Sequence, residues 1–348
     1  MTDDLSFFAG KRVFVTGHTG FKGVWLTALL ESAGAEVFGY ALEPTTPFFA
    51  LVADAQVHSV IGDVRDLRSL KCAVDAARPD VVFHMAAQPL VIEGFREPVT
   101  TYETNVMGTV NLLECVRLAD WPILCAVNVT TDKVYENHEW VWPYRESDVL
   151  NGHDPYSNSK SCSELVTAAY RQSLLPSGVP VSTARAGNVI GGGDFAANRI
   201  ITDCVQAVTN GRPISVRNPS SVRPYQHVLE ALSAYVTIAS ATANNQELAG
   251  AFNVGPRDGD GVSTADLATM FCEAWGDSAT WVHAEADTPP EASLLRLDSS
   301  YITERLGWRP RWTTQQAVSA TVKWYKCWFD KGDVKKLMDE QVESFFGF

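Results

Sequence analysis

Hydrophobic and polar residues in the first half of the chain follow two alternating patterns. Short runs rich in Val and Ile predict β-strands, and longer stretches with apolar residues at helical spacing predict helices between them. Strands that are apolar on both faces and separated by helices indicate a parallel sheet covered on both sides, a doubly wound α/β fold. The predicted strands are Arg12–Thr16, Glu36–Tyr40, Asp80–His84, Ile123–Val129 and Val181–Arg185. The predicted helices are Phe21–Ala33, Asp66–Ala77, Thr100–Leu118 and Asp154–Gln172.

The pattern changes in the second half of the chain. Two short predicted strands, Ile214–Val216 and Ala251–Val254, lie among helices and loops that contain Pro and Gly. An amphipathic helix is predicted at Thr313–Phe329, and its aromatic residues are expected to pack in a core. We therefore expect residues 1–186 to form the main domain and residues 187–348 to form mainly a smaller α/β domain, interleaved with late strands of the main sheet.

The chain has 348 residues, with 28 Lys and Arg against 41 Asp and Glu, and a net charge of −13. So acidic a protein disfavours nucleic acid and anionic membranes as partners. The chain has no run of about eighteen apolar residues, and its acidic start, Met1-Thr-Asp-Asp, is unlike a basic signal peptide. The seven cysteines are scattered, with no CxxC pair. We expect reduced cysteines, a cytoplasmic protein and no metal site.

A glycine-rich turn, TGHTGFKG at residues 16–23, follows the first predicted strand and opens the first predicted helix. One glycine permits the tight turn, one lets the backbone approach a diphosphate, and one lets the helix pack on the strand. The N-terminus of the helix offers free N–H groups and the positive end of its dipole to an anion. This arrangement predicts a Rossmann-like dinucleotide site formed by Gly17, His18, Thr19, Gly20, Phe21, Lys22 and Gly23.

The type of dinucleotide depends on residues farther along the chain. An acidic residue about twenty positions beyond the glycine turn binds the adenosine ribose of NAD. Glu43 lies near that distance but past the end of the strand, and no Arg stands beside it to bind a 2′-phosphate, so NAD is predicted rather than NADP. Asp63, followed by Val64, is a candidate for the adenine amino group; the alternative is an ordinary Asp at a strand end.

Tyr156 and Lys160 are four residues apart and lie on one face of a predicted helix. The pKa of a free tyrosine is about 10, which is too high for a base at neutral pH, so a nearby cation must stabilise the phenolate. The lysine can also hold the nicotinamide ribose. Together with the glycine turn, the pair predicts a catalytic Tyr156 and Lys160, both of which also contact the cofactor.

The run Thr130-Thr131-Asp132-Lys133 follows a predicted strand, so it lies at the carboxyl edge of the sheet, where ligands bind. Thr130 is expected beside the cofactor, and Thr131 is expected to hydrogen-bond a sugar hydroxyl. Asp132 and Lys133 offer an acid and a base on consecutive residues. A lysine can act as the base only if desolvation or a neighbouring cation lowers its pKa. The alternative is a solvated ion pair in a loop.

These motifs together resemble the extended short-chain dehydrogenase/reductase family and, within it, the CDP-glucose 4,6-dehydratases. The Asp-Lys pair distinguishes the CDP-glucose 4,6-dehydratases better than the other motifs do, since many related sugar-nucleotide dehydratases carry Asp-Glu there. The matching runs cover nearly the whole chain: VTGHTGFKG (15–23), FHMAAQPLV (83–91), NVMGTVNLLE (105–114), TTDKVYEN (130–137), HDPYSNSK (153–160), RAGNVIGGGD (185–194), VRPYQHVLE (222–230) and NVGPRD (253–258).

The resemblance implies a hydro-lyase that converts CDP-glucose to CDP-4-dehydro-6-deoxyglucose by internal hydride transfer through bound NAD. Tyr156 would remove the proton of the 4-hydroxyl while hydride leaves C4. Lys133 would then take the C5 proton, and Asp132 would protonate the leaving 6-hydroxyl before hydride returns at C6. The resemblance also implies a homodimer that pairs through the two helices predicted at 100–118 and 154–172.

Further roles follow from the resemblance by position. His227 is expected to begin a helix rather than to take part in chemistry. The arginines among the substrate residues would bind the diphosphate, with an ordinary surface position as the alternative for each. The expected cofactor residues are Ala86, Ala87, Gln88, Ala186 and Asn188. The expected substrate residues are Asn188, Arg199, Arg217, Arg223 and Glu291.

The chain departs from the family pattern near the expected hexose site. Relatives commonly carry Arg, Ser and Tyr where this chain has Ile92, Gly94 and Phe95, and histidines often flank the Glu-Ala at 291–292. One alternative is therefore a dehydratase for another nucleotide sugar. A second is a nucleotide-sugar 4-epimerase, which needs no Asp-Lys pair. A third is a non-catalytic NAD-binding scaffold, which would be expected to lack one of the catalytic residues.

Overall fold

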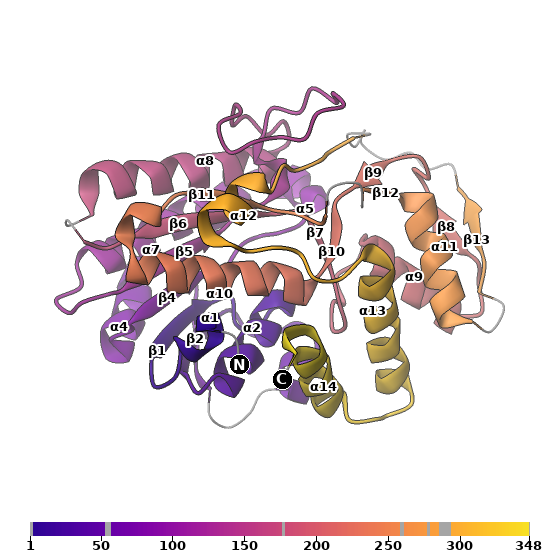
Figure 1. Ribbon diagram of the computed structural model, residues 1–348, viewed down its shortest axis with the longest axis horizontal. Helices are drawn as coiled ribbons and strands as arrows, with labels where there is room; N and C mark the ends of the chain where they lie inside the picture. The colour runs from indigo at the N-terminus through magenta and orange to yellow at the C-terminus, as the bar shows by residue number, and fades with distance from the viewer. Residues whose placement is uncertain are drawn as a thin grey trace.

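The computed structural model describes residues 3–52, 57–175, 178–257, 261–276, 279–284 and 294–347. Its central element is a seven-stranded sheet in the order β11-β6-β5-β4-β1-β2-β3, with every neighbouring pair parallel (Figure 1). The doubly wound α/β fold predicted from the sequence is confirmed. The strands are β1 (Arg12–Thr16), β2 (Glu36–Ala41), β3 (His58–Ile61), β4 (Val81–His84), β5 (Cys125–Val129), β6 (Val181–Ala186) and β11 (Ala251–Val254).

The order of the strands reverses at β1, which pairs with β2 on one side and β4 on the other. Phe14 of β1 lies opposite Phe38 on one neighbour and Val82 on the other. Parallel strands connected in opposite directions leave a crevice at their carboxyl ends, and α/β sheets bind ligands there. The glycine turn follows β1, so it lies at this crevice.

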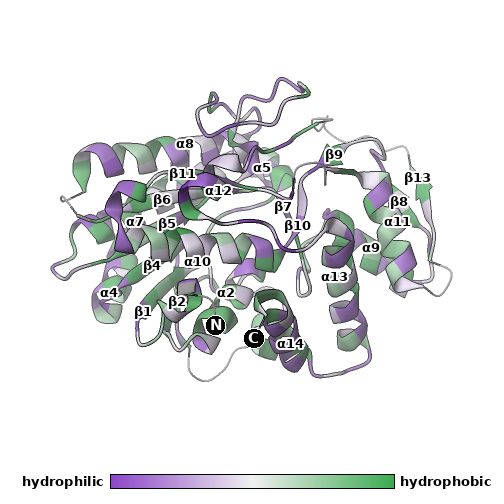
Figure 2. Ribbon diagram, viewed as in Figure 1, coloured by the Kyte–Doolittle hydropathy of each residue, from purple (hydrophilic) through white to green (hydrophobic). Residues whose placement is uncertain are grey.

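Helices cover both faces of the sheet and enclose two hydrophobic cores. Val13 and Val15 of β1 point into one core, and Phe14 points into the other, as the alternation of side chains along a strand requires. Figure 2 shows hydrophobic residues along the central strands. The first core is covered by α1 (Asp3–Ser6), α2 (Phe21–Ser32) and α10 (Val228–Asn244), the second by α4 (Leu67–Ala77), α7 (Gly108–Arg117) and α8 (Pro155–Ala169).

Two predicted helix boundaries are confirmed by their hydrogen bonds. The carboxylate of Asp66 accepts from the backbone N–H groups of Arg68 and Ser69 and so begins α4. The ring of His227 accepts from the backbone N–H of Leu229 at the start of α10. The polar residues preceding these helices therefore supply the acceptors that the first N–H groups lack.

The helix predicted at Thr100–Leu118 is divided in the structure. It begins at α6 (Pro98–Tyr102), passes through a π-helical turn, η1 (Glu103–Met107), and continues as α7. The π turn contains the buried Asn105, whose amide donates to Gln88 O at 3.1 Å and to Ser159 Oγ at 2.8 Å. The helix predicted to end at Gln172 likewise closes with a π turn, η3 (Tyr170–Leu174). Neither irregularity changes the spacing of apolar residues enough to be seen in the sequence.

The second half of the chain builds a smaller α/β region beside the sheet, on the right in Figure 1. It has three two-stranded sheets, β7–β10, β9–β12 and β8–β13, among the described residues. Its strands are β7 (Asn188–Ile190), β8 (Ile214–Val216), β9 (Val222–Arg223), β10 (Tyr225–His227), β12 (Val262–Ser263) and β13 (Trp281–His283). Its helices are α9 (Ile200–Thr209), α11 (Thr264–Trp275), α13 (Thr314–Phe329) and α14 (Val334–Phe346).

The chain returns to the main sheet after this region has begun. Strand β11 pairs with β6, and α10 packs against β5 and β6. Helix α13 begins with a capping box between Thr313 and Gln316, and its Trp324 and Tyr325 are buried. The remaining short elements are α3 (Phe48–Val52), α5 (Val91–Arg96), η2 (Asp132–Val134), η4 (Gln246–Leu248) and α12 (Ser300–Leu306).

Within the described ranges, no helix is long and apolar enough to span a membrane. The same part of the chain holds no group of three His, Cys, Asp or Glu side chains placed to bind a metal ion.

Candidate functional site

A cavity of about 330 Å³ opens at the carboxyl edge of the sheet. Its wall comes from the segments after β4, β5 and β6, from the start of α8, and from α9, β8 and β9. The structure therefore brings together side chains from both halves of the chain. The predicted site residues that line this cavity are Lys22, Thr130, Thr131, Asp132, Lys133, Tyr156, Ala186, Asn188, Arg199, Arg217 and Arg223.

Tyr156 and Lys160 are positioned by the first turn of α8. The helix begins at the cap residue Asp154, which accepts from Ser157 N at 3.0 Å. Lys160 is buried and donates from Nζ to Val129 O at 3.0 Å, and burial lowers the pKa of Lys160 to about 8. Burial raises the pKa of Tyr156, while neighbouring positive charges act in the opposite direction.

Asp132 and Lys133 form a close pair in the wall of the cavity. Lys133 Nζ lies 3.3 Å from Asp132 Oδ1 and donates to Asn188 Oδ1 at 3.2 Å. Asp132 is fully buried, and its Oδ2 has no hydrogen-bond partner among the described residues. Burial alone would lower the pKa of Lys133, but the charges of Asp132 and Tyr156 outweigh it and raise that pKa.

The sequence required a lowered pKa for Lys133 to act as a base. In the structure without substrate, the pKa of Lys133 is raised instead. The reason is the adjacent carboxylate, which favours the ammonium form of Lys133. As for the alternative of a solvated ion pair in a loop, the Asp132 side chain is 1% exposed and the Lys133 side chain 32% exposed, so only the lysine side chain of the pair meets solvent.

A buried ion pair that the sequence reading missed supports this site from behind. Glu164 accepts from Arg185 Nη2 at 2.9 Å, and both side chains are almost completely buried. Glu164 also accepts from Thr130 Oγ1 at 2.5 Å and from Thr183 Oγ1 at 2.8 Å. This network ties α8 to β6 and to the end of β5. Its signal in the sequence is that Glu164 follows Lys160 by four residues on the same helix face.

The glycine turn has the shape that a diphosphate requires. Gly17 has φ of 78°, and a Cβ there would lie 2.8 Å from Ala86 N. A Cβ at Gly23 would lie 2.1 Å from Gly17 O, so only glycine fits there. Gly20 begins α2 without a side-chain cap, which leaves the first N–H groups of the helix for an external anion. The turn therefore fits the diphosphate of a dinucleotide.

The side chains of His18, Thr19 and Phe21 face the protein. His18 is fully buried with its Nε2 2.7 Å from Ser59 Oγ, and burial lowers the pKa of His18 to about 4. Thr19 Oγ1 donates to Leu42 O at 3.1 Å, and Phe21 packs at the edge of the first core. These side chains brace the turn from within the fold.

Lys22, by contrast, lines the cavity. Among the described residues its ammonium makes no hydrogen bond or ion pair, and it faces the ring of Tyr235 at 5.9 Å. Burial lowers the pKa of Lys22 to about 7, and the charges of Lys160 and Arg199 act in the same direction. A nearby anion would favour its positive form.

The other predicted cofactor residues lie at the ends of β3 and β4, outside the wall of the 330 Å³ cavity. Asp63 Oδ2 accepts from Arg65 Nη2 at 2.6 Å, and these hydrogen bonds lower the pKa of Asp63. Val64 is buried, and its carbonyl accepts from Asn111 Nδ2 at 2.9 Å. Gln88 donates to Thr101 Oγ1 at 2.9 Å. The half-buried residues beside it are Ala86 and Ala87.

The three candidate arginines occupy different parts of the cavity. Arg199 pairs with Asp194 at 3.0 Å, and its charge lowers the pKa of Tyr156 against the effect of burial. The charge of Arg223 acts on Lys133. The charge of Arg217 acts instead on Asp203 of α9. Glu291, the remaining predicted substrate residue, lies outside the described residues, as do Pro290 and Ser293.

The segment that departs from the family pattern forms α5, which packs against α8. Ile92 lines the cavity, whereas Phe95 is exposed. A Cβ at Gly94 would lie 3.1 Å from Tyr156 N. Glycine thus allows α5 to approach α8 more closely than a serine would, and Ile92 makes that part of the wall apolar.

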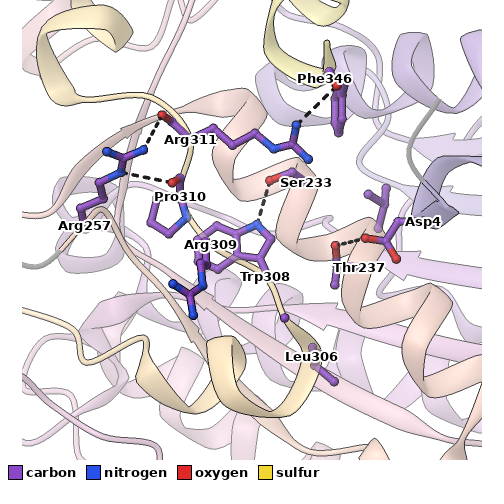
Figure 3. Close-up of a pocket in the computed structure, with 12 residues that line it drawn as sticks. Asp4, Ser233, Thr237, Arg257, Leu306, Trp308, Arg309, Pro310, Arg311 and Phe346 are labelled. Carbon is purple, nitrogen blue, oxygen red and sulfur yellow. Dashed lines mark hydrogen bonds between the residues drawn. The ribbon is translucent and has the colours of Figure 1, made fainter. Parts of the chain in front are cut away.

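A second cavity, of about 420 Å³, lies between α10, the segment 306–311 and the end of α14 (Figure 3). None of the predicted site residues lines it. Arg257 donates to Arg311 O at 3.0 Å, and Arg311 donates to Phe345 O at 3.1 Å. Trp308 Nε1 donates to Ser233 Oγ at 2.9 Å. These bonds tie the segment to α10 and α14, so its arginines stabilise the fold.

The fold and the site define a nucleotide-sugar-modifying member of the extended short-chain dehydrogenase/reductases. The family model described as GDP-mannose 4,6 dehydratase matches residues 14–321, and the chain belongs to this family. A relative from Salmonella typhimurium, a CDP-glucose 4,6-dehydratase, is 46% identical over 352 residues, which cover 98% of each chain. The resemblance inferred from the sequence is confirmed.

Solved structures agree with this assignment. The UDP-glucose 4-epimerase of Thermus thermophilus, in complex with NAD, has a TM-score of 0.79 at 26% identity and covers 90% of this chain and 98% of its own. The dTDP-glucose 4,6-dehydratase of Streptomyces venezuelae, with NAD bound, has a TM-score of 0.76 at 25% identity and covers 90% and 97%.

Proposed function

We propose that this protein is an NAD-dependent nucleotide-sugar 4,6-dehydratase whose substrate is CDP-glucose. The observation that carries the proposal is the Asp132–Lys133 pair, 3.3 Å apart, in the same cavity as Tyr156. A 4-epimerase needs the tyrosine and NAD, but no second acid and base to remove water. The full-length similarity to the Salmonella CDP-glucose 4,6-dehydratase supports the choice of nucleotide.

The glycine turn would hold the NAD diphosphate on the N-terminus of α2, with Lys22 as an added positive charge. Asp63 would bind the adenosine end, and Lys160 would bind the nicotinamide ribose. When bound, NAD supplies a hydride acceptor at C4 of the sugar and a hydride donor at C6. The residues that would line the cofactor elsewhere are Val64, Ala86, Ala87, Gln88, Thr130, Ala186 and Asn188.

Tyr156 would take the proton of the sugar 4-hydroxyl, with Thr131 as a hydrogen-bond partner of that group. Because burial raises the pKa of Tyr156, its phenolate requires positive neighbours. Lys133 and Arg199 already act in that direction. Lys160 lies one helical turn away, and with a pKa of about 8 it is largely protonated at neutral pH.

The Asp132–Lys133 pair would then remove water. Oxidation at C4 acidifies the C5 proton, and Lys133 in its neutral form can accept that proton. Transfer of one proton from Lys133 to Asp132 converts the ion pair into a neutral amine and a neutral carboxylic acid. Exclusion of water favours this neutral form, because both charged groups lose their solvation.

Elimination restores the original state of the pair. Lys133 gains the C5 proton, and Asp132 gives its proton to the leaving 6-hydroxyl, so one water departs and the ion pair re-forms. The unpartnered Asp132 Oδ2 is the atom available to carry that proton. Return of hydride to C6 then requires a proton at C5, which the Lys133 ammonium would supply after exchange with solvent. The cycle closes when Tyr156 releases the proton of the 4-hydroxyl and Lys133 takes one up. Arg199 and Arg223 line the same cavity and would bind the diphosphate of the substrate.

The proposal is tested by incubating the protein with NAD and CDP-glucose in deuterated water and analysing the sugar by mass spectrometry and NMR. Dehydration predicts the loss of one water and one solvent deuterium at C5. A product changed only in its C4 configuration would instead show an epimerase. Dehydration of a different nucleotide-glucose but not of CDP-glucose would refute the nucleotide assignment, and an intact sugar in every case would refute the enzyme.

We also propose a homodimer that forms through the outer faces of α6, η1 and α8. Val99, Met107 and Leu165 are exposed on these elements, which contact one another, and the partner would cover them in such a dimer. Light scattering is expected to show a dimer for the wild type and a monomer for Leu165→Arg. The control is Leu42→Arg, because Leu42 is also exposed but follows β2, which is not part of the proposed interface. A monomeric wild type would refute this assembly.

A further inference from the structure

The cavity extends well past the catalytic residues. Arg199 and Arg223 act on Tyr156 and Lys133, whereas the charge of Arg217 is felt by Asp203. If the hexose lies at Tyr156 and the diphosphate at the first two arginines, the nucleoside must occupy the part of the cavity formed by α9 and β8. The residues of that part therefore meet the base.

Two side chains of α9 give this end of the cavity an apolar and an acidic component. Ile200 and Asp203 are three residues apart, so they lie on the same helix face, and both line the cavity. Asp203 is only partly exposed, and burial raises the pKa of Asp203 against the effects of Arg217 and the Asn198 backbone. Its carboxylate oxygens make no ion pair within the described ranges, so their lone pairs can accept hydrogen bonds from a ligand.

Arg217, just after the end of β8, is the basic counterpart. Its charge acts on Asp203, but within the described ranges no ion pair within 4.0 Å joins the two side chains. The guanidinium donors and the carboxylate oxygens thus remain available to a ligand. Asp203 and Arg217 both line the cavity, so an acceptor and a set of donors face the space where the base must lie.

Resting on the function proposed above, we infer that Asp203 and Arg217 read the hydrogen-bonding edge of cytosine. Cytosine presents an amino donor at N4 beside acceptors at N3 and O2, which matches a carboxylate beside a guanidinium. Uracil and thymine present an acceptor at O4 and a donor at N3, so both contacts would be reversed. Ile200 supplies an apolar surface for the face of the base.

The test compares the affinities of the NAD-loaded protein for CDP and UDP by calorimetry, which does not require turnover. The wild type is expected to prefer CDP, and Asp203→Asn is expected to reduce that preference by about tenfold or more. Asparagine has nearly the same shape as aspartate, so the variant removes the charge and one acceptor oxygen with little change in packing. Glu273→Gln on α11 removes an equal charge away from the cavity and should leave the preference unchanged.

Arg217→Lys provides a second variant that retains the charge but loses the fork of donors, and it should weaken CDP binding more than UDP binding. Equal affinity of the wild type for the two nucleotides would overturn the inference. An unchanged preference in both Asp203→Asn and Arg217→Lys would do the same. Dehydration of CDP-glucose by the wild type tests the proposed function separately, because it can succeed while the base preference lies elsewhere.

In the dehydration assay, Asp203→Asn is expected to raise KM for CDP-glucose by about tenfold with little change in kcat, since the base contact is the same in ground and transition states. A general structural defect would instead lower kcat for every nucleotide-glucose alike. That second result would overturn the assignment of Asp203 to the base.

Discussion

Glu230, at the start of α10, makes the stability of this protein depend on pH. It is 1% exposed, and its Oε1 accepts from Arg311 N at 2.8 Å and from Trp312 N at 2.5 Å. Its Oε2 has no hydrogen-bond partner in the described part of the chain. Burial raises the pKa of Glu230 from 4.5 to about 7, despite the opposing charges of Arg311 and Arg257.

The direction of the effect follows from proton linkage. Because the pKa of Glu230 is higher in the folded state, the neutral carboxyl favours folding relative to the carboxylate. This contribution to the free energy of unfolding is fully present below pH 4.5 and is lost as the pH rises through about 7. One pKa unit corresponds to about 1.4 kcal/mol, so the step from 4.5 to about 7 is worth about 3 kcal/mol. Glu230→Gln keeps the Oε1 acceptor and stays neutral at every pH.

The free energy of unfolding is measured by urea titration of both proteins between pH 5 and pH 9. Across this range, the free energy of unfolding of the variant is expected to rise relative to that of the wild type by about 3 kcal/mol. The difference should be complete once the pH has passed about 7. Glu247→Gln, exposed on η4, is the matched control and should follow the wild type. Parallel curves for wild type and Glu230→Gln would refute the reasoning.

Four further results are expected. Tyr156→Phe should bind NAD but form no NADH with substrate, as followed by absorbance; full turnover would remove Tyr156 from the mechanism. Lys133→Met should oxidise C4 without incorporating solvent deuterium at C5, and retained incorporation would assign the base elsewhere. Glu164→Ala leaves Arg185 buried without its partner and should lower the free energy of unfolding by about 3–5 kcal/mol in urea, whereas a loss below about 1 kcal/mol would contradict the buried pair. NAD binding should take up a proton near pH 7–9 in calorimetry with two buffers, and Lys22→Met should abolish the uptake; uptake that persists in the variant would exclude Lys22 as its source.

Local patterns in the sequence predicted the parts of this protein that depend on near neighbours. The glycine turn, the Asp66 cap and the Tyr156–Lys160 pair each involve residues within about one or two helical turns of one another. Their spacing alone therefore specifies their geometry. Six of the seven strands of the main sheet were predicted for the same reason, because a strand buried on both faces carries its apolar pattern within a few residues. The edge strand β3 was not predicted, since all four of its residues are exposed and its sequence lacks that pattern.

Interactions between distant segments could not be predicted in this way. Glu164 stands on the predicted catalytic face of its helix, but its partner Arg185 belongs to β6, and only the packing of α8 on that strand brings them together. The π turn that places Asn105 beside Gln88 has no local signature either. The pKa of Lys133 is raised by Asp132 and Tyr156, and the second of these is a tertiary neighbour.

The net charge of −13 and an anionic substrate are compatible because they act over different distances. Exposed carboxylates are screened beyond about 8 Å at physiological ionic strength, so they weigh little on a ligand inside the cavity. Lys22, Arg199 and Arg223 line that cavity, where the low polarity of the surroundings strengthens their effect. Lys22 is kept partly neutral by burial and by its cationic neighbours until an anion arrives. The empty cavity therefore avoids the full cost of a buried Lys22 ammonium, and it gains that charge when the diphosphates bind.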